Sequence, residues 1–413
     1  MIDYLFIFQV FGSVFGALLI SLSGYLICSY FNCTGVTAWY YPAIGYLVLS
    51  SIFYPLVLFG LDAGLVFDFG ASLLVISGVY SMQKMMSERI FGNIRAGRII
   101  KNNQVDSTII TLFFLASIGI VTNADSLDYH LGVAKYLLVT GDWTPQHYWF
   151  HSRVAGAGEV MNAFALNFGL SSLTNLYQFF GLIAIFGVFK SLRSTNDITG
   201  DRWRCWRRLL AFGVISSPCL IWLSVSTAKP QLVGIGLNAI VFYLIESKKS
   251  SYLSVRDYLF IIFVLAALTN IKYSFNATSA ILGLYLSFIV IAQNVRVRPR
   301  FIIKYFGACL FVGLLIVGPK FIFNYITYNP VSYMDLIAMF PGDLPGYDAF
   351  SSMHTRYADM DLPFPLFLLI PDRLGELTSI LGFGLVGLIF AVTVGKFRHD
   401  VIIPVALSFL TIG

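Results

Sequence analysis

Repeated apolar runs, each close to the length that crosses a bilayer, constrain this chain more than any other feature of its sequence. Hydrophobic residues make up 57% of the 413 positions and charged residues 12%, whereas a soluble domain is about one quarter charged. A helix needs about 20 apolar residues to span hydrocarbon. The sequence therefore predicts an all-α polytopic integral membrane protein and excludes an ordinary soluble fold.

The apolar runs place membrane spans near 4–30, 39–60, 63–82, 107–122, 171–189, 209–226, 230–246, 257–270, 273–292, 305–324, 374–394 and 401–413. The first run has no basic segment before it and no small-residue cleavage site, so we interpret it as a retained span. The small-residue segment 155–170 is predicted to be a re-entrant piece, a surface helix or half of a helical hairpin. Since the last run stops at Gly413 without a polar tail, we expect the chain to be a piece of a longer protein.

Most of the 27 lysines and arginines fall in five short loops, at 84–101, 190–208, 246–257, 294–304 and 395–400. Basic loops mark the cytoplasmic side of a membrane protein, and the spans place all five loops on one side. The long segments 123–159 and 326–373 then lie outside, with four basic residues against ten acidic ones. Because topology explains the net charge of +6, no nucleic-acid partner is expected.

The first outer segment opens with NADSLDYHL, which places Asp125 and Asp128 three residues apart. Residues at i and i+3 share a helix face, and the residues that follow predict an amphipathic helix over 127–139 along the membrane surface. Helix capping is the simpler explanation for an aspartate after a span. A pair of carboxylates at this position also suits chemistry at the outer mouth. Further polar candidates in the segment are His130, His147, Arg153 and Glu159.

Two lysines interrupt apolar sequence, Lys229 in STAKPQLVGIGL and Lys272 in ALTNIKYS. Each lysine alone is explained by snorkelling of its ammonium group to the interface. Both fall at predicted outer turns, however, and a charge at membrane depth usually faces a cavity with a partner or ligand. We therefore expect carboxylates, histidines and lysines to meet around one outer cleft.

The cysteines and histidines predict no metal site. The five cysteines show no CxxC spacing, and the histidines show no HxH spacing. We therefore expect neither a disulfide framework nor a bound metal from them.

Four stretches in chain order resemble GT-C-type membrane glycosyltransferases, especially bacterial members. ADSLDYHLGVAKYLLVTGDW resembles their first outer loop, and STAKPQLVGIGL and ALTNIKYS resemble two later lysine-containing stretches. FIFNYITYNPVSYMDLIAMF resembles a fourth segment, although Phe323 replaces the arginine that usually precedes the asparagine corresponding to Asn324. The resemblance covers about 107–345.

The resemblance implies a GT-C-like bundle of about 11–13 transmembrane helices with an amphipathic helix on the outer face. It implies transfer of a sugar from a polyprenyl-phosphate donor to a lipid, glycan or protein acceptor on the periplasmic or extracellular side of a bacterial plasma membrane. This activity belongs to cell-envelope polysaccharide biosynthesis. No cofactor is expected, with a divalent metal as the alternative because some members require one.

The resemblance also suggests roles for individual residues. Asp125 would be the base on the acceptor hydroxyl, with Asp128 and His130 orienting it or the acceptor. The residues expected to bind substrate or donor phosphate are Lys229, Lys272, Arg153, Arg356, His147, Glu159 and Asn324. The expected organisation is N-terminal spans with a basic loop in 1–106, the core in 107–325, an outer loop and lid in 326–373, and C-terminal spans in 374–413.

Three other functions are alternatives. A secondary transporter of an anionic solute would also place charges at depth, but the sequence shows no internal repeat. An O-antigen polymerase or ligase would use similar lipid-linked sugars, but its main outer loop should be rich in arginine and histidine. A scaffold without catalytic activity would tolerate the replacement of Asp125 by asparagine.

Overall fold

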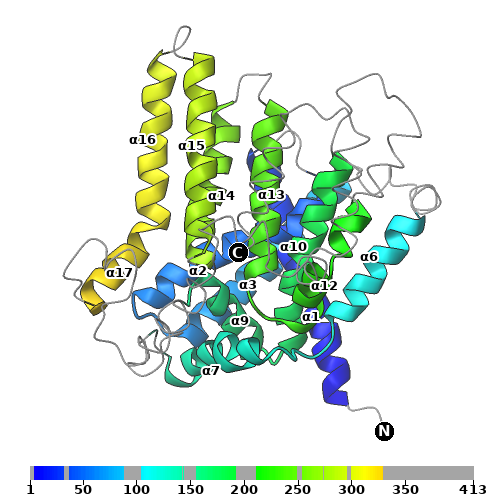
Figure 1. The fold of residues 1–413 in the computed structure, drawn as a ribbon. Helices are drawn as coiled ribbons and strands as arrows, with labels where there is room; N and C mark the ends of the chain where they lie inside the picture. The colour runs from blue at the N-terminus through cyan, green and yellow to red at the C-terminus, as the bar shows by residue number, and fades with distance from the viewer. Residues whose placement is uncertain are drawn as a thin grey trace, which may run out of the picture.

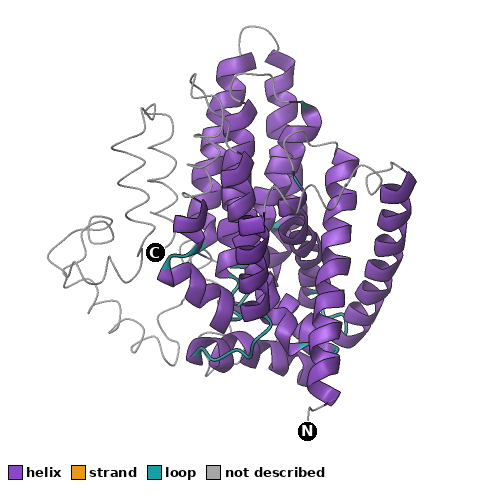
Figure 2. Ribbon diagram, turned by 90° about the vertical axis from the view of Figure 1, so that its right-hand side faces the viewer, coloured by secondary structure: helices purple, strands orange, loops and turns teal. Residues whose placement is uncertain are grey.

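The computed structural model describes residues 4–31, 37–87, 104–141, 143, 155–191, 211–248, 254–272, 274–294 and 299–328. Regular structure in these ranges is helical, with no strand (Figures 1 and 2). This confirms the predicted all-α class. The helices are α1 (Tyr4–Phe31), η1 (Ala38–Tyr40), α2 (Tyr41–Leu58), α3 (Ala63–Ser87), α6 (Gln104–Ser117), η2 (Ser126–His130), α7 (Leu131–Thr140), α9 (Ala157–Asn167), α10 (Ser171–Ser191), α12 (Pro218–Ser226), α13 (Gln231–Lys248), α14 (Val255–Ile271), α15 (Phe275–Asn294), α16 (Pro299–Ile316) and α17 (Gly318–Tyr328).

Several of these helices can cross a membrane. Within the described ranges, five are long and apolar enough, namely α1, η1 with α2, α3, α10 and α15, and the bent pair α16–α17 brings the number to six. The chain is therefore a polytopic membrane protein. The predicted spans 374–394 and 401–413 lie outside the described residues.

Two predicted spans contain a break in the helix. The span 209–226 contains a helical turn at 211–215 and then α12, with a break at Ser217 before Pro218. The span 305–324 bends by 46° between α16 and α17, where Gly318 and Pro319 follow Val317. Proline lacks the N–H that would continue a helix and its ring clashes with the preceding turn, which explains both breaks.

The segment 155–170 contains the helix α9 and the turn into α10, and of the three options that the sequence left open the surface helix is wrong. Residues 157–165 of α9 are all buried, which excludes a helix lying on the surface. A tight turn joins α9 to α10, and Gly169 in it has a φ of 68°, a left-handed conformation that favours glycine.

Polar contacts define two opposite ends of the bundle. At one end, Lys190 of α10 lies 2.5 Å from Asp106 of α6, and Tyr285 of α15 contacts Glu246 of α13. The other end carries α7 and α9, at the bottom of Figure 1. Lys190 and Glu246 begin two of the predicted basic loops, so these loops leave the bundle at the end opposite α7 and α9. Which end faces the cytoplasm stays a prediction.

Small residues let the helices approach closely. A Cβ atom on Gly181 of α10 would lie 2.0 Å from the carbonyl oxygen of Leu232 on α13, and one on Gly236 of α13 would lie 2.6 Å from the oxygen of Gly181. Backbone-to-backbone approach of this kind is the usual way in which membrane helices associate. The α10–α13 pair therefore depends on both glycines.

Replacement of Gly181 by alanine should destabilise the protein by about 1–3 kcal/mol, because the added methyl group overpacks a backbone contact. The measurement is the thermal unfolding midpoint of the detergent-solubilised protein. Gly283→Ala is the matched control, since a Cβ atom on Gly283 of α15 meets nothing within 4 Å. Equal midpoints for the two variants would contradict the close α10–α13 contact.

Candidate functional site

The described segment that follows α6 starts with a capped helix that fixes the position of Asp125. The Asn123 Oδ1 atom accepts hydrogen bonds from the N–H and the hydroxyl of Ser126, each at 3.0 Å. An asparagine that accepts from the third residue after it is a typical N-cap. The helix continues through the π-helical turn η2 into α7. It ends at Gly141, whose φ is 71°. The predicted helix over 127–139 is confirmed.

The spacing of Asp125 and Asp128 predicted that both carboxylates face the same site, but only Asp125 does so. The wide π turn changes the spacing around the helix axis. Asp125 contacts Lys229, whereas Asp128 is exposed and makes no hydrogen bond or ion pair with another described residue. The structure therefore does not bring Asp128 into the cluster.

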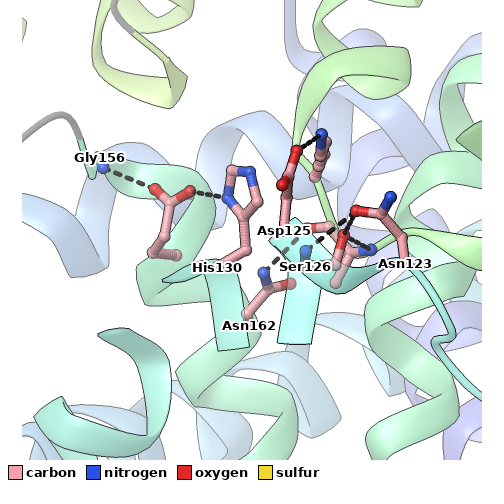
Figure 3. Close-up of polar contacts among 9 residues, drawn as sticks. Asn123, Asp125, Ser126, His130, Gly156 and Asn162 are labelled. Carbon is pink, nitrogen blue, oxygen red and sulfur yellow. Dashed lines mark hydrogen bonds and ion pairs between the residues drawn. The ribbon is translucent and has the colours of Figure 1, made fainter. Parts of the chain in front are cut away.

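Backbone contacts hold the linker between α12 and α13 against this helix. The N–H groups of Thr122 and Asn123 both donate to the oxygen of Ser226 at 3.1 Å. The Ala228 N–H donates to the Ser126 hydroxyl at 3.2 Å, and the Asn162 amide of α9 donates to the Ala228 oxygen at 3.0 Å (Figure 3). Three segments far apart in the sequence thus fix the residue that follows, Lys229.

Lys229 forms an ion pair with Asp125. Its Nζ lies 2.5 Å from Asp125 Oδ2 and 5.3 Å from the centre of the Trp222 ring. The Asp125 side chain is 62% exposed, whereas that of Lys229 is 12% exposed. A ligand can therefore reach the carboxylate from solvent while the lysine stays largely buried.

His130 and Glu159 form a second, buried pair. The His130 Nδ1 atom lies 2.5 Å from Glu159 Oε1, with side chains 0% and 2% exposed. The Gly156 N–H donates to Glu159 Oε2 at 2.6 Å, at the N-terminus of α9, where the helix dipole favours a negative charge. Burial lowers the pKa of His130, and nearby Lys272 and Lys229 lower it further, although the contact with Glu159 opposes them.

Close approach of the backbone brings Glu159 to the end of α14. A Cβ atom on Gly156 would lie 2.3 Å from the oxygen of Asn270, and one on Gly158 would lie 2.4 Å from Pro230. Only glycine fits these positions without movement of a neighbour. The small residues in this stretch therefore place α9 against both lysine-bearing turns.

Lys272 ends α14 beside the two pairs. Burial lowers its pKa to about 8, while attraction to Glu159 and Asp125 raises it and repulsion by Lys229 lowers it. Lys272 is thus protonated at neutral pH and loses its proton more readily than an exposed lysine.

Lys320 of α17 is a further cation that the sequence analysis missed. It is buried, its Nζ donates to the Thr269 oxygen at 3.3 Å, and it lies within electrostatic reach of Glu159. Asn324 is also buried and lies one turn later on the same helix. Lys320 supplies a cation near the position where Phe323 replaces the arginine of the resembled pattern. A lysine inside a predicted span, next to Gly318 and Pro319, was the available indication.

Five predicted site residues meet at this end of the bundle: Asp125, His130, Glu159, Lys229 and Lys272. His147, Arg153 and Arg356 lie outside the described residues. Within the described part of the chain, no group of three or more His, Cys, Asp or Glu side chains could hold a metal ion.

Charge in the cluster favours an anionic ligand. Three lysine ammonium groups, from Lys229, Lys272 and Lys320, face two carboxylates, from Asp125 and Glu159. An excess of positive charge in a partly buried site attracts anions. The arrangement can therefore bind a phosphate and also offers hydrogen-bond acceptors for a hydroxyl group.

Residues 84–413 match the family described as the DUF1420 N-terminal domain. No curated protein matches the chain. No solved structure matches it either.

Proposed function

The chain belongs to the DUF1420 family, and we propose that it is a membrane glycosyltransferase with a GT-C-like bundle. It moves a sugar from a polyprenyl-phosphate or polyprenyl-diphosphate donor to a lipid, glycan or protein acceptor on the outer face of the membrane. The observation that carries this proposal is the excess of lysine over carboxylate groups in the cluster, at the end of the bundle opposite Lys190 and Glu246, where two of the predicted basic loops begin.

The proposed chemistry needs both kinds of group. When the sugar leaves, negative charge develops on the donor phosphate, and cations placed at that position lower the barrier. Lys229, Lys272 and Lys320 would supply them. Asp125 is exposed enough to meet an acceptor hydroxyl, and it releases Lys229 to the phosphate when the donor arrives. Positioning of this kind contributes strongly to rate.

The proposal is tested with membranes that contain the wild type or Asp125→Asn at equal protein level. A pool of labelled polyprenyl-phosphate sugars is added, and mass spectrometry follows the donor and the released polyprenyl phosphate. Wild-type membranes should consume one donor, and Asp125→Asn should reduce the rate by roughly 10²-fold, the effect of lost positioning in an active site.

The matched control is Asp106→Asn. Asp106 and Lys190 form an ion pair with the same 2.5 Å separation as Asp125 and Lys229, but at the opposite end of the bundle. This variant should keep the rate of transfer. Failure of wild-type membranes to consume any donor, combined with uptake of an anionic solute, would replace the transferase with a transporter.

A further inference from the structure

The imidazole of His130 has one nitrogen with a partner and one without. Its Nδ1 contacts Glu159 Oε1 at 2.5 Å, whereas its Nε2 is buried and makes no hydrogen bond with any described residue. Buried polar atoms almost always have partners, so an unpaired one needs an explanation. A ligand atom that hydrogen-bonds to Nε2 would provide it.

Glu159 determines which nitrogen carries the proton. Its Oε2 already accepts from the Gly156 N–H, and its Oε1 faces His130 Nδ1. A carboxylate only accepts hydrogen bonds, so Nδ1 carries the proton and Nε2 of the neutral ring keeps its lone pair. Nε2 is then able to accept a proton.

Charged groups from three segments face this ring, and a neighbouring aromatic ring packs on it. Glu159 comes from α9, Lys229 from the turn before α13, Lys272 from the end of α14, and the Tyr129 ring stacks on the imidazole with centres 3.8 Å apart. Figure 3 shows the His130 ring between the carboxylate bonded to Nδ1 and the side chain of Asp125. Glu159 itself also interacts electrostatically with Tyr46 of α2 and Lys320 of α17. His130 therefore lies among the residues to which the proposed function assigns substrate binding.

From this geometry we infer that His130, and not Asp125, accepts the proton of the acceptor hydroxyl, and that Glu159 is the positioning residue behind it. The inference rests on the proposed transferase function. The hydroxyl proton moves to Nε2 while the hydroxyl oxygen forms its bond to the anomeric carbon. The bond between that carbon and the phosphate oxygen breaks, and its electron pair stays on the phosphate beside the lysines.

The surroundings favour His130 over Asp125 for this step. One oxygen of Asp125 lies on the Lys229 ammonium group, which stabilises the unprotonated carboxylate and weakens it as a base. His130 is backed by a buried carboxylate, which stabilises the imidazolium that forms. A bound donor phosphate would also neutralise Lys229 and Lys272, the two cations that disfavour protonation of His130. Its basicity thus rises when the donor is in place.

The test is the pH profile of kcat/KM for sugar transfer in the wild type, His130→Gln and Glu159→Gln. The wild-type rate should fall on the acid side as pH drops through a value below 6.5, the ordinary value for histidine. His130→Gln keeps a group that can hydrogen-bond to Glu159 but cannot take up the proton, and should lose about 10²–10⁴-fold in rate. Lys135→Gln, on the exposed side of α7, is the control and should keep both the rate and the profile.

Glu159→Gln keeps an oxygen that accepts from Nδ1–H but removes the charge that favours the imidazolium. Its rate should fall and its acid limb should move to lower pH, a shift that a purely structural role would not produce. An acid limb at the wild-type position in either variant would overturn the inference while leaving transfer itself in place.

A second readout does not depend on activity. The ring nitrogens of ¹⁵N-histidine-labelled protein give different NMR shifts for the two neutral tautomers, and His130→Gln identifies the His130 signals. The expected result is protonated Nδ1 and unprotonated Nε2. Protonated Nε2 in the neutral ring would overturn the inference, whereas the expected tautomer in a protein that transfers no sugar would overturn the proposed function instead.

Discussion

Replacement of Lys272 by glutamine should lower the rate of sugar release from the donor by roughly 10²–10³-fold, the effect of removing one group that stabilises a developing oxyanion. Lys272 lies at the junction of Glu159, Asp125 and Lys229, where a donor phosphate would meet it. Glutamine keeps a donor N–H but carries no charge. The measurement is the single-turnover rate of polyprenyl phosphate formation by purified protein.

The same residue predicts the alkaline pH dependence. The pKa of Lys272 is lowered to about 8, so the charged form is present below this pH and is lost as pH rises through it. The wild-type kcat/KM should therefore fall above about pH 8. Lys272→Arg keeps its charge, since a guanidinium stays protonated throughout this range, and should flatten the fall. Identical alkaline limbs for the wild type and Lys272→Arg would show that Lys272 does not bind the donor phosphate.

Replacement of Gly156 by valine should abolish transfer and destabilise the protein by about 3 kcal/mol, at the upper end of the usual cost of overpacking. A Cβ atom there would lie 2.3 Å from the Asn270 oxygen and 2.9 Å from the Ile271 oxygen. Both oxygens belong to the backbone at the end of α14 and cannot rotate away. The clash would push the start of α9, and Glu159 with it, away from Lys272.

Two measurements check this prediction. The thermal unfolding midpoint reports stability, and the ¹⁵N signal of His130 reports whether Glu159 still contacts Nδ1. Gly307→Val is the control, because a Cβ atom on Gly307 of α16 meets nothing within 4 Å. A Gly156→Val protein with the wild-type midpoint and the wild-type His130 signal would contradict the close α9–α14 contact.

Local patterns predicted the helices well because apolar run length decides membrane insertion directly. The helix breaks fall at Pro218 and at Gly318–Pro319. These residues indicate a break, but the continuous hydrophobicity around them predicted an uninterrupted span. Run length alone treats a bent pair such as α16–α17 as one span. Proline and glycine inside a run therefore carry more structural information than its mean hydropathy.

The sequence predicted which residues gather at the candidate site, but it did not predict which carboxylate contacts which cation. Alternation of basic loops places the turns that carry Asp125, Lys229 and Lys272 at one end, since each span reverses the chain. Which carboxylate meets which cation depends on helix packing, and in particular on the approach of α9 to α14 through Gly156. That contact joins residues more than a hundred positions apart, which one sequence does not reveal.

Two errors have local causes. Asp128 was paired with Asp125 because α-helical spacing was assumed, whereas the chain passes through the π turn Ser126–His130. Lys320 was passed over because it lies inside an apolar run, although a buried charge in a membrane span is a functional indication by itself.

The most direct test of the central claim uses purified protein in lipid vesicles with one labelled polyprenyl-phosphate sugar and its acceptor. Polyprenyl phosphate and glycosylated acceptor should appear in equal amounts, and Lys272→Gln and His130→Gln should slow the formation of both products together. Donor that stays intact with every acceptor, or that crosses the bilayer without losing its sugar, would contradict the glycosyltransferase assignment.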